Sequence, residues 1–312
     1  MTSKTKNKKS AKVASKQITK LHCPVCKGSM TFFYGVESQK FGRTFRYFRC
    51  DNCRHIIVDP ILSEKELFED YDYEPVKIGG AQKKVSGLIF HSPLYHFFFG
   101  SKRFVKAVIT KYRQRYHKDP KTYLDFGSGN GLNLAYFHEL LPAATCIGYE
   151  RATDGKRFPN TSIRVLQDLT EVKKRKYDII TLFHVLEHIA DLEGFAKVLR
   201  AIADEHTVLY FQIPYADSLD MKLIHQLKSD FTLHTPYHTN IFSLQSLKQY
   251  FQDHGFEVTS VNWEVYQIGS IVMNQNIVVK TVLFLPLLVL GYINKLTKTT
   301  PYISLYVKKI GA

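Results

Sequence analysis

A glycine-rich turn at residues 127–131 constrains the fold of this chain more than any other feature. It follows a short apolar run at residues 122–124 and precedes a helix-like run at residues 132–137. Glycines allow the backbone to turn sharply and to approach a ligand with no Cβ in the way. A strand, a glycine turn and a helix in this order predict an α/β fold that binds a nucleotide-like ligand.

The spacing of the glycines argues against a phosphate cradle. It is G-x-G-x-G, which differs from the G-x-G-x-x-G of dinucleotide folds and from the P-loop, and no Lys-Ser or Lys-Thr follows. The acid Asp125 precedes the turn, where a carboxylate would repel a pyrophosphate but suits a cationic or amine-bearing ligand. A second acid, Glu150, ends the apolar run at residues 145–149, where it can accept hydrogen bonds from both ribose hydroxyls.

These residues resemble the class I S-adenosylmethionine (SAM) methyltransferases, in which a D/E-x-G-x-G-x-G turn surrounds the methionine moiety and an acid after strand 2 binds the ribose. The resemblance covers residues 120–263. It implies a Rossmann-like α/β fold, with a mostly parallel seven-stranded sheet and an antiparallel last strand. Further strands are expected at residues 163–168, 177–183, 208–214 and from 255, with a terminal strand at 303–309.

The resemblance also implies SAM as the cofactor. Asp168 falls where the family places an adenine-contacting acid, and Phe183 with His184 is expected to line the cofactor floor. A doubly wound fold for another nucleotide is the alternative, and the order and spacing of the elements argue against it. The implied cofactor-binding residues are Asp125, Gly127, Ser128, Gly129, Gly131, Glu150, Asp168, Phe183 and His184.

Two histidine-rich segments follow predicted strands 4 and 5, where this fold holds the methyl acceptor. The first, residues 184–188, also matches the H-x-x-E-H motif of inverted zinc peptidases, but that motif requires a helix and this segment follows a β-branched strand. We expect Glu187 and His188 to face the acceptor or to cap a helix. His188 is therefore a candidate catalytic residue.

The second segment contains Tyr237 and His238 and precedes a helix that is expected to begin at the cap Ser243. It resembles the acceptor loop of zinc-ribbon sugar C-methyltransferases, in which a Glu-His pair precedes the same Phe-Ser element and the histidine acts as a base. Tyr237 replaces that glutamate, which favours an oxygen or nitrogen acceptor over carbon. His238 is a candidate base or a structural loop histidine, and Tyr237 is a candidate partner of the acceptor.

Four of the five cysteines form two C-x-x-C pairs. This spacing is typical of a structural Zn²⁺ site with four thiolates. Strand-like runs at residues 30–34 and 43–48 predict a zinc-ribbon hairpin between the pairs. A redox dithiol, the alternative, needs one C-x-x-C at a helix start. Reduced thiolates fit a cytoplasmic protein. The expected ligands are Cys23, Cys26, Cys50 and Cys53.

The chain outside the core has a biased composition. Residues 1–20 carry many lysines and no acid, contribute strongly to the net charge of +15, and are expected to form a disordered tail. This tail is either solubilising or the one region suited to RNA, DNA or an anionic membrane. The expected domains are this tail, a zinc ribbon at 21–60, a helical linker or lid at 61–119, the core at 120–263, and an apolar helical insertion with a terminal strand at 264–312.

Three interpretations compete for the apolar segment at residues 277–293, which Pro286 interrupts. It is a helix packed on the core or on a second subunit in a homo-oligomer, a peripheral contact with the inner membrane face, or a true span. Within the lid, Ser63 and Glu66 match a capping box, and Tyr71 and Tyr73 are candidate lid residues.

Together these features predict SAM-dependent methyl transfer to a small-molecule or glycan acceptor, such as a sugar of a bacterial polysaccharide. One alternative is a quinone-like or lipid acceptor at a membrane surface. A second alternative is a non-catalytic methyltransferase fold that binds RNA or a protein partner. The intact acids Asp125 and Glu150 and the intact glycine turn argue against the non-catalytic alternative.

Overall fold

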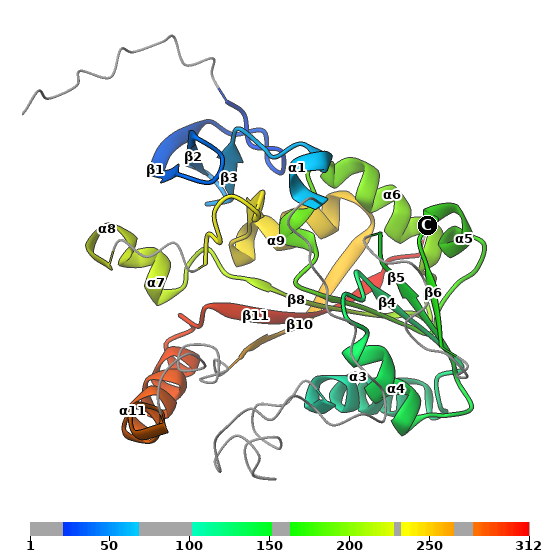
Figure 1. Cartoon of the computed structure of the whole chain (residues 1–312). Coiled ribbons are helices and arrows are strands. Elements are labelled where there is room, and N and C mark those ends of the chain that lie inside the picture. The colour runs from blue at the N-terminus through cyan, green and yellow to red at the C-terminus, as the bar shows by residue number, and fades with distance from the viewer. Residues whose placement is uncertain (1–20, 69–101, 152–162, 228–231, 265–276, 312) are drawn as a thin grey trace, which may run out of the picture.

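The computed structural model describes residues 21–68, 102–151, 163–227, 232–264 and 277–311 (Figure 1). Within these ranges the chain forms one seven-stranded sheet and one four-stranded sheet, with helices around them. The lysine-rich tail and the candidate lid residues Tyr71 and Tyr73 lie outside the described residues.

The seven-stranded sheet has the predicted class I methyltransferase topology. Its order is β10-β11-β8-β7-β4-β5-β6. Neighbouring strands from β8 to β6 pair in parallel, and β11 lies antiparallel between β8 and β10. The strands are β4 (Thr122–Phe126), β5 (Thr145–Tyr149), β6 (Arg164–Leu166), β7 (Ile179–Phe183), β8 (Val208–Pro214), β10 (Phe256–Trp263) and β11 (Tyr302–Lys309).

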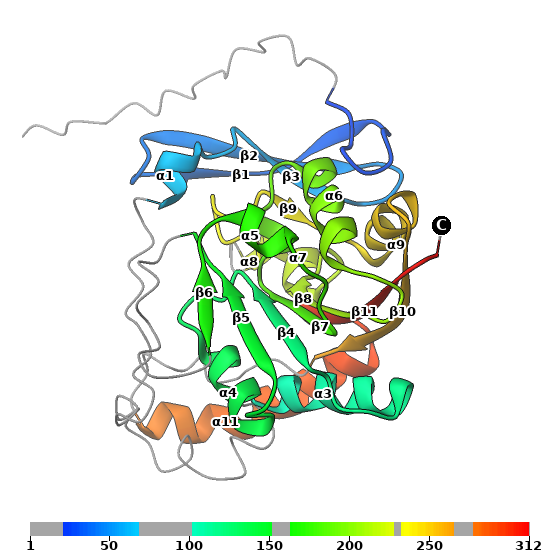
Figure 2. The same cartoon turned by 90° about the vertical axis from the view of Figure 1, so that its right-hand side faces the viewer.

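Helices cover both faces of this sheet (Figure 2). Helices α3 (Lys102–Tyr116) and α4 (Leu132–Leu140) lie on one face, and α5 (Leu169–Lys173), α6 (Leu192–Ile202) and α9 (Leu244–Asp253) lie on the other. Successive side chains of β4 point to opposite faces of the sheet, so this strand contacts helices on both faces. Tyr123 stacks on Phe137 of α4 at 3.9 Å, while Phe126 contacts Phe195 of α6 at 5.4 Å.

The N-terminal hairpin belongs to the four-stranded sheet, whose last strand comes from the methyltransferase core. Strands β1 (Met30–Ser38) and β2 (Arg43–Cys50) form the predicted hairpin, and β3 (Ile56–Asp59) pairs with β2. Strand β3 then pairs with β9 (Asn240–Ile241), which belongs to the second histidine-rich segment. The hairpin therefore lies over the layer of α6 and α9 (Figure 2) and is joined directly to it.

Side-chain hydrogen bonds also hold the N-terminal sheet to the segment that contains β9. His55 is fully buried, and its Nε2 donates to Asn240 Oδ1 at 2.9 Å. The Asn240 amide donates in turn to the carbonyl of Ile189 at 2.6 Å. Ser243, the predicted cap of α9, donates its hydroxyl to the Cys53 carbonyl at 2.5 Å. The second cysteine-bearing turn is thus bonded to the chain that leads into α9.

Two further expected elements appear in the peripheral segments. Ser63 and Glu66 form the capping box of α1 (Glu64–Phe68): the Ser63 N–H donates to Glu66 Oε2 at 2.8 Å, and the Glu66 N–H donates to Ser63 Oγ at 3.3 Å. Helix α11 (Ile277–Leu296) connects β10 to β11 and stands apart from the sheet (Figure 1).

The C-terminal half of α11 is covered on one face, at Leu287, Leu288 and Gly291, and exposes apolar side chains on the other. Val289, Leu290, Tyr292, Ile293 and Leu296 are exposed, Leu296 by 82%. No helix in the described ranges combines the length and hydrophobicity that a membrane crossing requires.

Candidate active site

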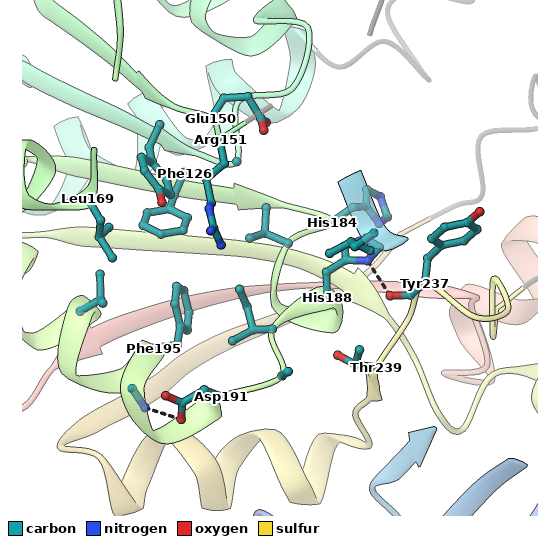
Figure 3. Close-up of a pocket in the computed structure, with 18 of the residues that line it drawn as sticks. Phe126, Glu150, Arg151, Leu169, His184, His188, Asp191, Phe195, Tyr237 and Thr239 are labelled. Atoms are coloured by element: carbon teal, nitrogen blue, oxygen red, sulfur yellow. Dashed lines mark hydrogen bonds between the residues drawn. The ribbon is translucent and has the colours of Figure 1, made fainter. Parts of the chain in front are cut away.

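A cavity of about 710 Å³ lies at the carboxyl ends of β4, β5 and β7. Leu169 and Phe195 form one side of it, and His188, Tyr237 and Thr239 form the other (Figure 3). The segment before the core also contributes, because Ile61, Leu62 and Leu67 line the cavity. These three residues lie at the beginning of the predicted linker or lid at 61–119 and form part of the cavity wall.

The glycine turn borders this cavity in the conformation that only glycine adopts easily. Gly127, Gly129 and Gly131 have φ values of 73°, 50° and 79°. A Cβ at Gly127 would lie 2.5 Å from Cγ2 of Val185, so the turn is in close contact with the segment after β7. The Gly129 N–H donates to Glu150 Oε2 at 2.9 Å. The turn and the predicted ribose-binding acid therefore lie side by side.

Ser128 and Asp125 lie deeper than the cavity wall. The hydroxyl of Ser128 is buried without a hydrogen-bond partner among the described residues, and the Ser128 N–H donates to the carbonyl of Tyr149 at 3.0 Å. Asp125 is 1% exposed; its Oδ1 accepts from the Thr181 hydroxyl at 2.8 Å, while its Oδ2 has no partner in the described part of the chain. Beside the turn, Ser128 Oγ and Asp125 Oδ2 are thus available to bind a ligand.

The electrostatic setting of Asp125 favours a positively charged ligand. Burial raises the pKa of Asp125 to about 7; the hydrogen bond from Thr181 opposes this rise, and the charge of Glu150 adds to it. A carboxyl group in this state gains free energy when a cation or an N–H donor approaches its free oxygen.

Two predicted cofactor residues have other contacts. Asp168 caps α5 and accepts from the Thr170 N–H at 2.8 Å and from the Thr170 hydroxyl at 2.5 Å, which lowers the pKa of Asp168. Phe183 packs against Phe104 and Tyr210, with ring centroids 6.3 and 5.3 Å away. Neither lines the cavity, whereas Leu169, the neighbour of Asp168, does. Their cofactor contacts stay predictions.

The first histidine segment is a single 3₁₀ turn at Leu186–His188, so the zinc-peptidase geometry on one helix is absent from these residues. His184 has a φ of 54°, lines the cavity, and donates from Nδ1 to Glu187 Oε1 at 3.1 Å. Glu187 is fully buried. Burial opposes its ionisation, but the hydrogen bond from His184 and the charge of that ring hold the pKa of Glu187 below its usual range.

The two candidate bases differ in their access to the cavity. His188 lines it, and its Nδ1 donates to the Tyr237 carbonyl at 2.9 Å (Figure 3). His238 lies behind, 7% exposed, with Nδ1 bonded to the Thr232 carbonyl at 2.7 Å and its ring 5.0 Å from that of His188. Burial lowers the pKa of His238 to about 3, which makes its neutral ring a weak base.

The four predicted zinc ligands converge. Their sulfurs lie within 4.8 Å of one another, with Cys23 to Cys53 at 3.6 Å and Cys26 to Cys50 at 3.4 Å. Both turns have the same geometry: the residue after each pair, Lys27 or Arg54, is left-handed, and its N–H donates to the carbonyl of the first cysteine. Such a donor set fits one tetrahedral Zn²⁺.

The comparisons with known proteins agree with this fold. A family model described as "Methyltransferase domain" matches residues 100–261, more than half of the chain. The chain therefore belongs to this family and is a SAM-dependent methyltransferase. No curated protein matches it.

Several solved structures are similar at low identity. The plantazolicin methyltransferase BpumL, in complex with a monoazolic desmethylPZN analog and SAH, is 17% identical over 70% of this chain and 88% of its own, with a TM-score of 0.46. An O-methyltransferase from a trans-AT PKS multienzyme of Brevibacillus brevis is 15% identical over 76% of this chain and 82% of its own, with a TM-score of 0.42. The cyclopropane synthase MmaA2 from Mycobacterium tuberculosis is 12% identical over 70% of this chain and 88% of its own, with a TM-score of 0.47.

We predict that the four thiolates hold one Zn²⁺ that also stabilises the core. Titration with a mercurial reagent should release one zinc per chain from the cysteines. Cys50→Ser should lower the unfolding midpoint of the whole chain, because the second cysteine turn is bonded to Ser243 and β3 pairs with β9. Cys146→Ser, at the buried cysteine outside the cluster, is the control that should release the same zinc. Protein without thiolate-bound zinc contradicts the prediction.

Proposed function

We propose that this methyltransferase transfers the SAM methyl group to a small-molecule acceptor, or to a sugar of a glycan, in the cavity beside His188 and Tyr237. The observation that carries this proposal is that Gly127, Glu150, His188 and Tyr237 line one cavity of about 710 Å³. This volume falls within the usual range of small-molecule sites.

The residues present fit the cofactor. When bound, SAM supplies a methyl group that its sulfonium has already activated. We assign the ribose hydroxyls to Glu150, and its position beside the glycine turn, where Oε2 accepts from the Gly129 N–H, supports this assignment. The free oxygen of Asp125 is the acceptor for a cationic amino group. The apolar walls from Phe195 and Leu62 exclude water from the reacting groups.

On the acceptor side, we assign the proton-accepting role to His188 rather than to His238. The Nδ1–H of His188 is engaged by the Tyr237 carbonyl, which fixes the tautomer whose lone pair is on Nε2. His238 does not line the cavity, so its contribution is to support His188 and the loop. Tyr237 lines the cavity and is a further hydrogen-bonding partner for an acceptor hydroxyl.

A lipid or quinone-like acceptor is the second candidate, and the exposed side chains of α11 favour it. Apolar residues such as Leu290 and Ile293 are exposed next to Lys295 and Lys298, an arrangement suited to the surface of an anionic bilayer. Sedimentation with anionic vesicles should then be lost in Leu290→Asp/Ile293→Asp and kept in Lys308→Asp on β11. Equal sedimentation of all three proteins would refute this candidate.

Glu150→Ala should weaken SAM binding by about 1.5–3 kcal/mol, the range for a hydrogen bond to a charged group. Isothermal calorimetry measures this directly. Glu171→Ala, on α5, is the matched control and should bind SAM as the wild type does. Unchanged affinity in Glu150→Ala would remove that residue from the cofactor site.

SAM affinity should rise with pH up to about 7 because the cationic ligand requires the ionised form of Asp125, whose pKa is raised to about 7. Below that pH, binding must first remove a proton, so affinity falls by up to about tenfold per pH unit. Asp125→Asn should bind more weakly at pH 7 and lose this part of the pH dependence. Parallel profiles for the two proteins would show that Asp125 does not face the ligand.

A screen of metabolites and glycans with methyl-labelled SAM should identify the acceptor. With that acceptor, His188→Ala should lower turnover by roughly 10²–10⁴ and leave SAM affinity unchanged, because the change acts on the chemical step. His206→Ala is the control, because His206 is exposed and does not line the cavity. Wild-type turnover in His188→Ala would overturn the assignment.

A further inference from the structure

The segments after β7 and β8 bring together three metal-ligating side chains. Glu187, His188 and His238 each place one ligand atom so that all three lie within 4.8 Å of one another. Glu187 and His238 are buried, and His188 reaches the cavity. This cluster is separate from the four cysteines.

Hydrogen bonding leaves a free lone pair on each of the three residues. Both histidines direct Nδ1 at a backbone carbonyl, Tyr237 in one case and Thr232 in the other. A carbonyl only accepts, so Nδ1 carries a proton in both rings, and in the neutral form of each ring the lone pair is on Nε2. Glu187 accepts from His184 with Oε1, while its buried Oε2 has no partner among the described residues.

One acceptor of this cluster, Glu187 Oε2, is buried without a partner among the described residues. A buried acceptor without a partner costs about 1–3 kcal/mol, and more if it is charged. A proton on one histidine would satisfy Glu187 but leave the other ring nitrogen without a donor. A cation satisfies all three at once.

We propose that Glu187, His188 and His238 bind one divalent transition-metal ion, and that this ion holds an oxygen of the methyl acceptor in the cavity. Two imidazoles and one carboxylate suit ions such as Mn²⁺, Fe²⁺, Co²⁺ or Zn²⁺. Metal-bound histidines usually donate their second N–H to a carbonyl, as both rings do here. Because His188 lines the cavity, an ion held by these residues would lie beside the space for the acceptor.

The second half of this proposal rests on the proposed function and narrows the substrate to an acceptor with a hydroxyl or phenolic oxygen. Such an ion would lower the pKa of that hydroxyl, whose proton would leave to water at the mouth of the cavity before the methyl transfer takes place in the water-excluded site. The O–CH₃ bond then forms as the CH₃–S bond breaks, which yields the methylated acceptor and neutral S-adenosylhomocysteine. In the ion-bound enzyme His188 is a ligand; in the ion-free chain the same nitrogen is the base.

The test is a Mn²⁺ titration of the full-length, zinc-loaded protein, followed by electron paramagnetic resonance of the free ion. Mn²⁺ prefers oxygen and nitrogen ligands and does not displace zinc from thiolates. The wild type should bind one Mn²⁺ per chain. Glu187→Gln and His188→Gln should each weaken this binding by about 100-fold or more, and His206→Gln should leave it unchanged.

SAM binding is measured in the same samples so that the two proposals fail separately. A wild type that binds SAM but no Mn²⁺ overturns the ion site alone. Weak Mn²⁺ binding that is equal in all four proteins shows an adventitious ion and also overturns it. If Glu187→Gln does not fold, as judged by circular dichroism, the cavity-facing His188→Gln decides the outcome.

Discussion

The proposed acceptor half of the site, which contains His188 and Tyr237, depends on the backbone hydrogen bonds of Thr239. Its carbonyl accepts from the N–H of Val58 in β3 at 3.3 Å, and its own N–H donates to the carbonyl of Glu187 at 2.8 Å. Its hydroxyl donates to the same carbonyl at 3.0 Å. One residue therefore connects the cysteine-bearing sheet to the turn that carries Glu187 and His188. Under the proposed function, this connection gives the N-terminal sheet a role in placing Glu187 and His188.

The cofactor half is built by different contacts. The glycine turn is fixed by the β4–β5 pairing, by the hydrogen bond from Gly129 to Glu150 and by the close approach of Gly127 to Val185. None of these contacts involves the cysteine turns. The two halves meet in one cavity but derive their order from separate parts of the fold. Loss of the zinc site should therefore affect the acceptor side before the cofactor side.

The sequence predicted what is encoded locally. The glycine turn, the strand patterns and the paired cysteines each depend on neighbouring residues, and β5 and β8 have the bounds expected for them. The sequence did not predict β9, because a two-residue strand has no periodicity and forms only when β3 is beside it. The exclusion of His238 from the cavity and the burial of Glu187 also come from tertiary packing. The same holds for Asp168, whose capping of α5 competes with the role that its position implied.

The separate ordering of the two halves is tested most directly by amide hydrogen exchange of the full chain, before and after removal of the zinc that we predict the four thiolates hold. We expect faster exchange in β3 and in residues 239–242, because the Val58–Thr239 and Thr239–Glu187 bonds lose their support. The amides of residues 127–131 should exchange as before. Faster exchange confined to the cysteine turns, with residues 239–242 unchanged, would contradict a role of the N-terminal sheet in placing the acceptor site.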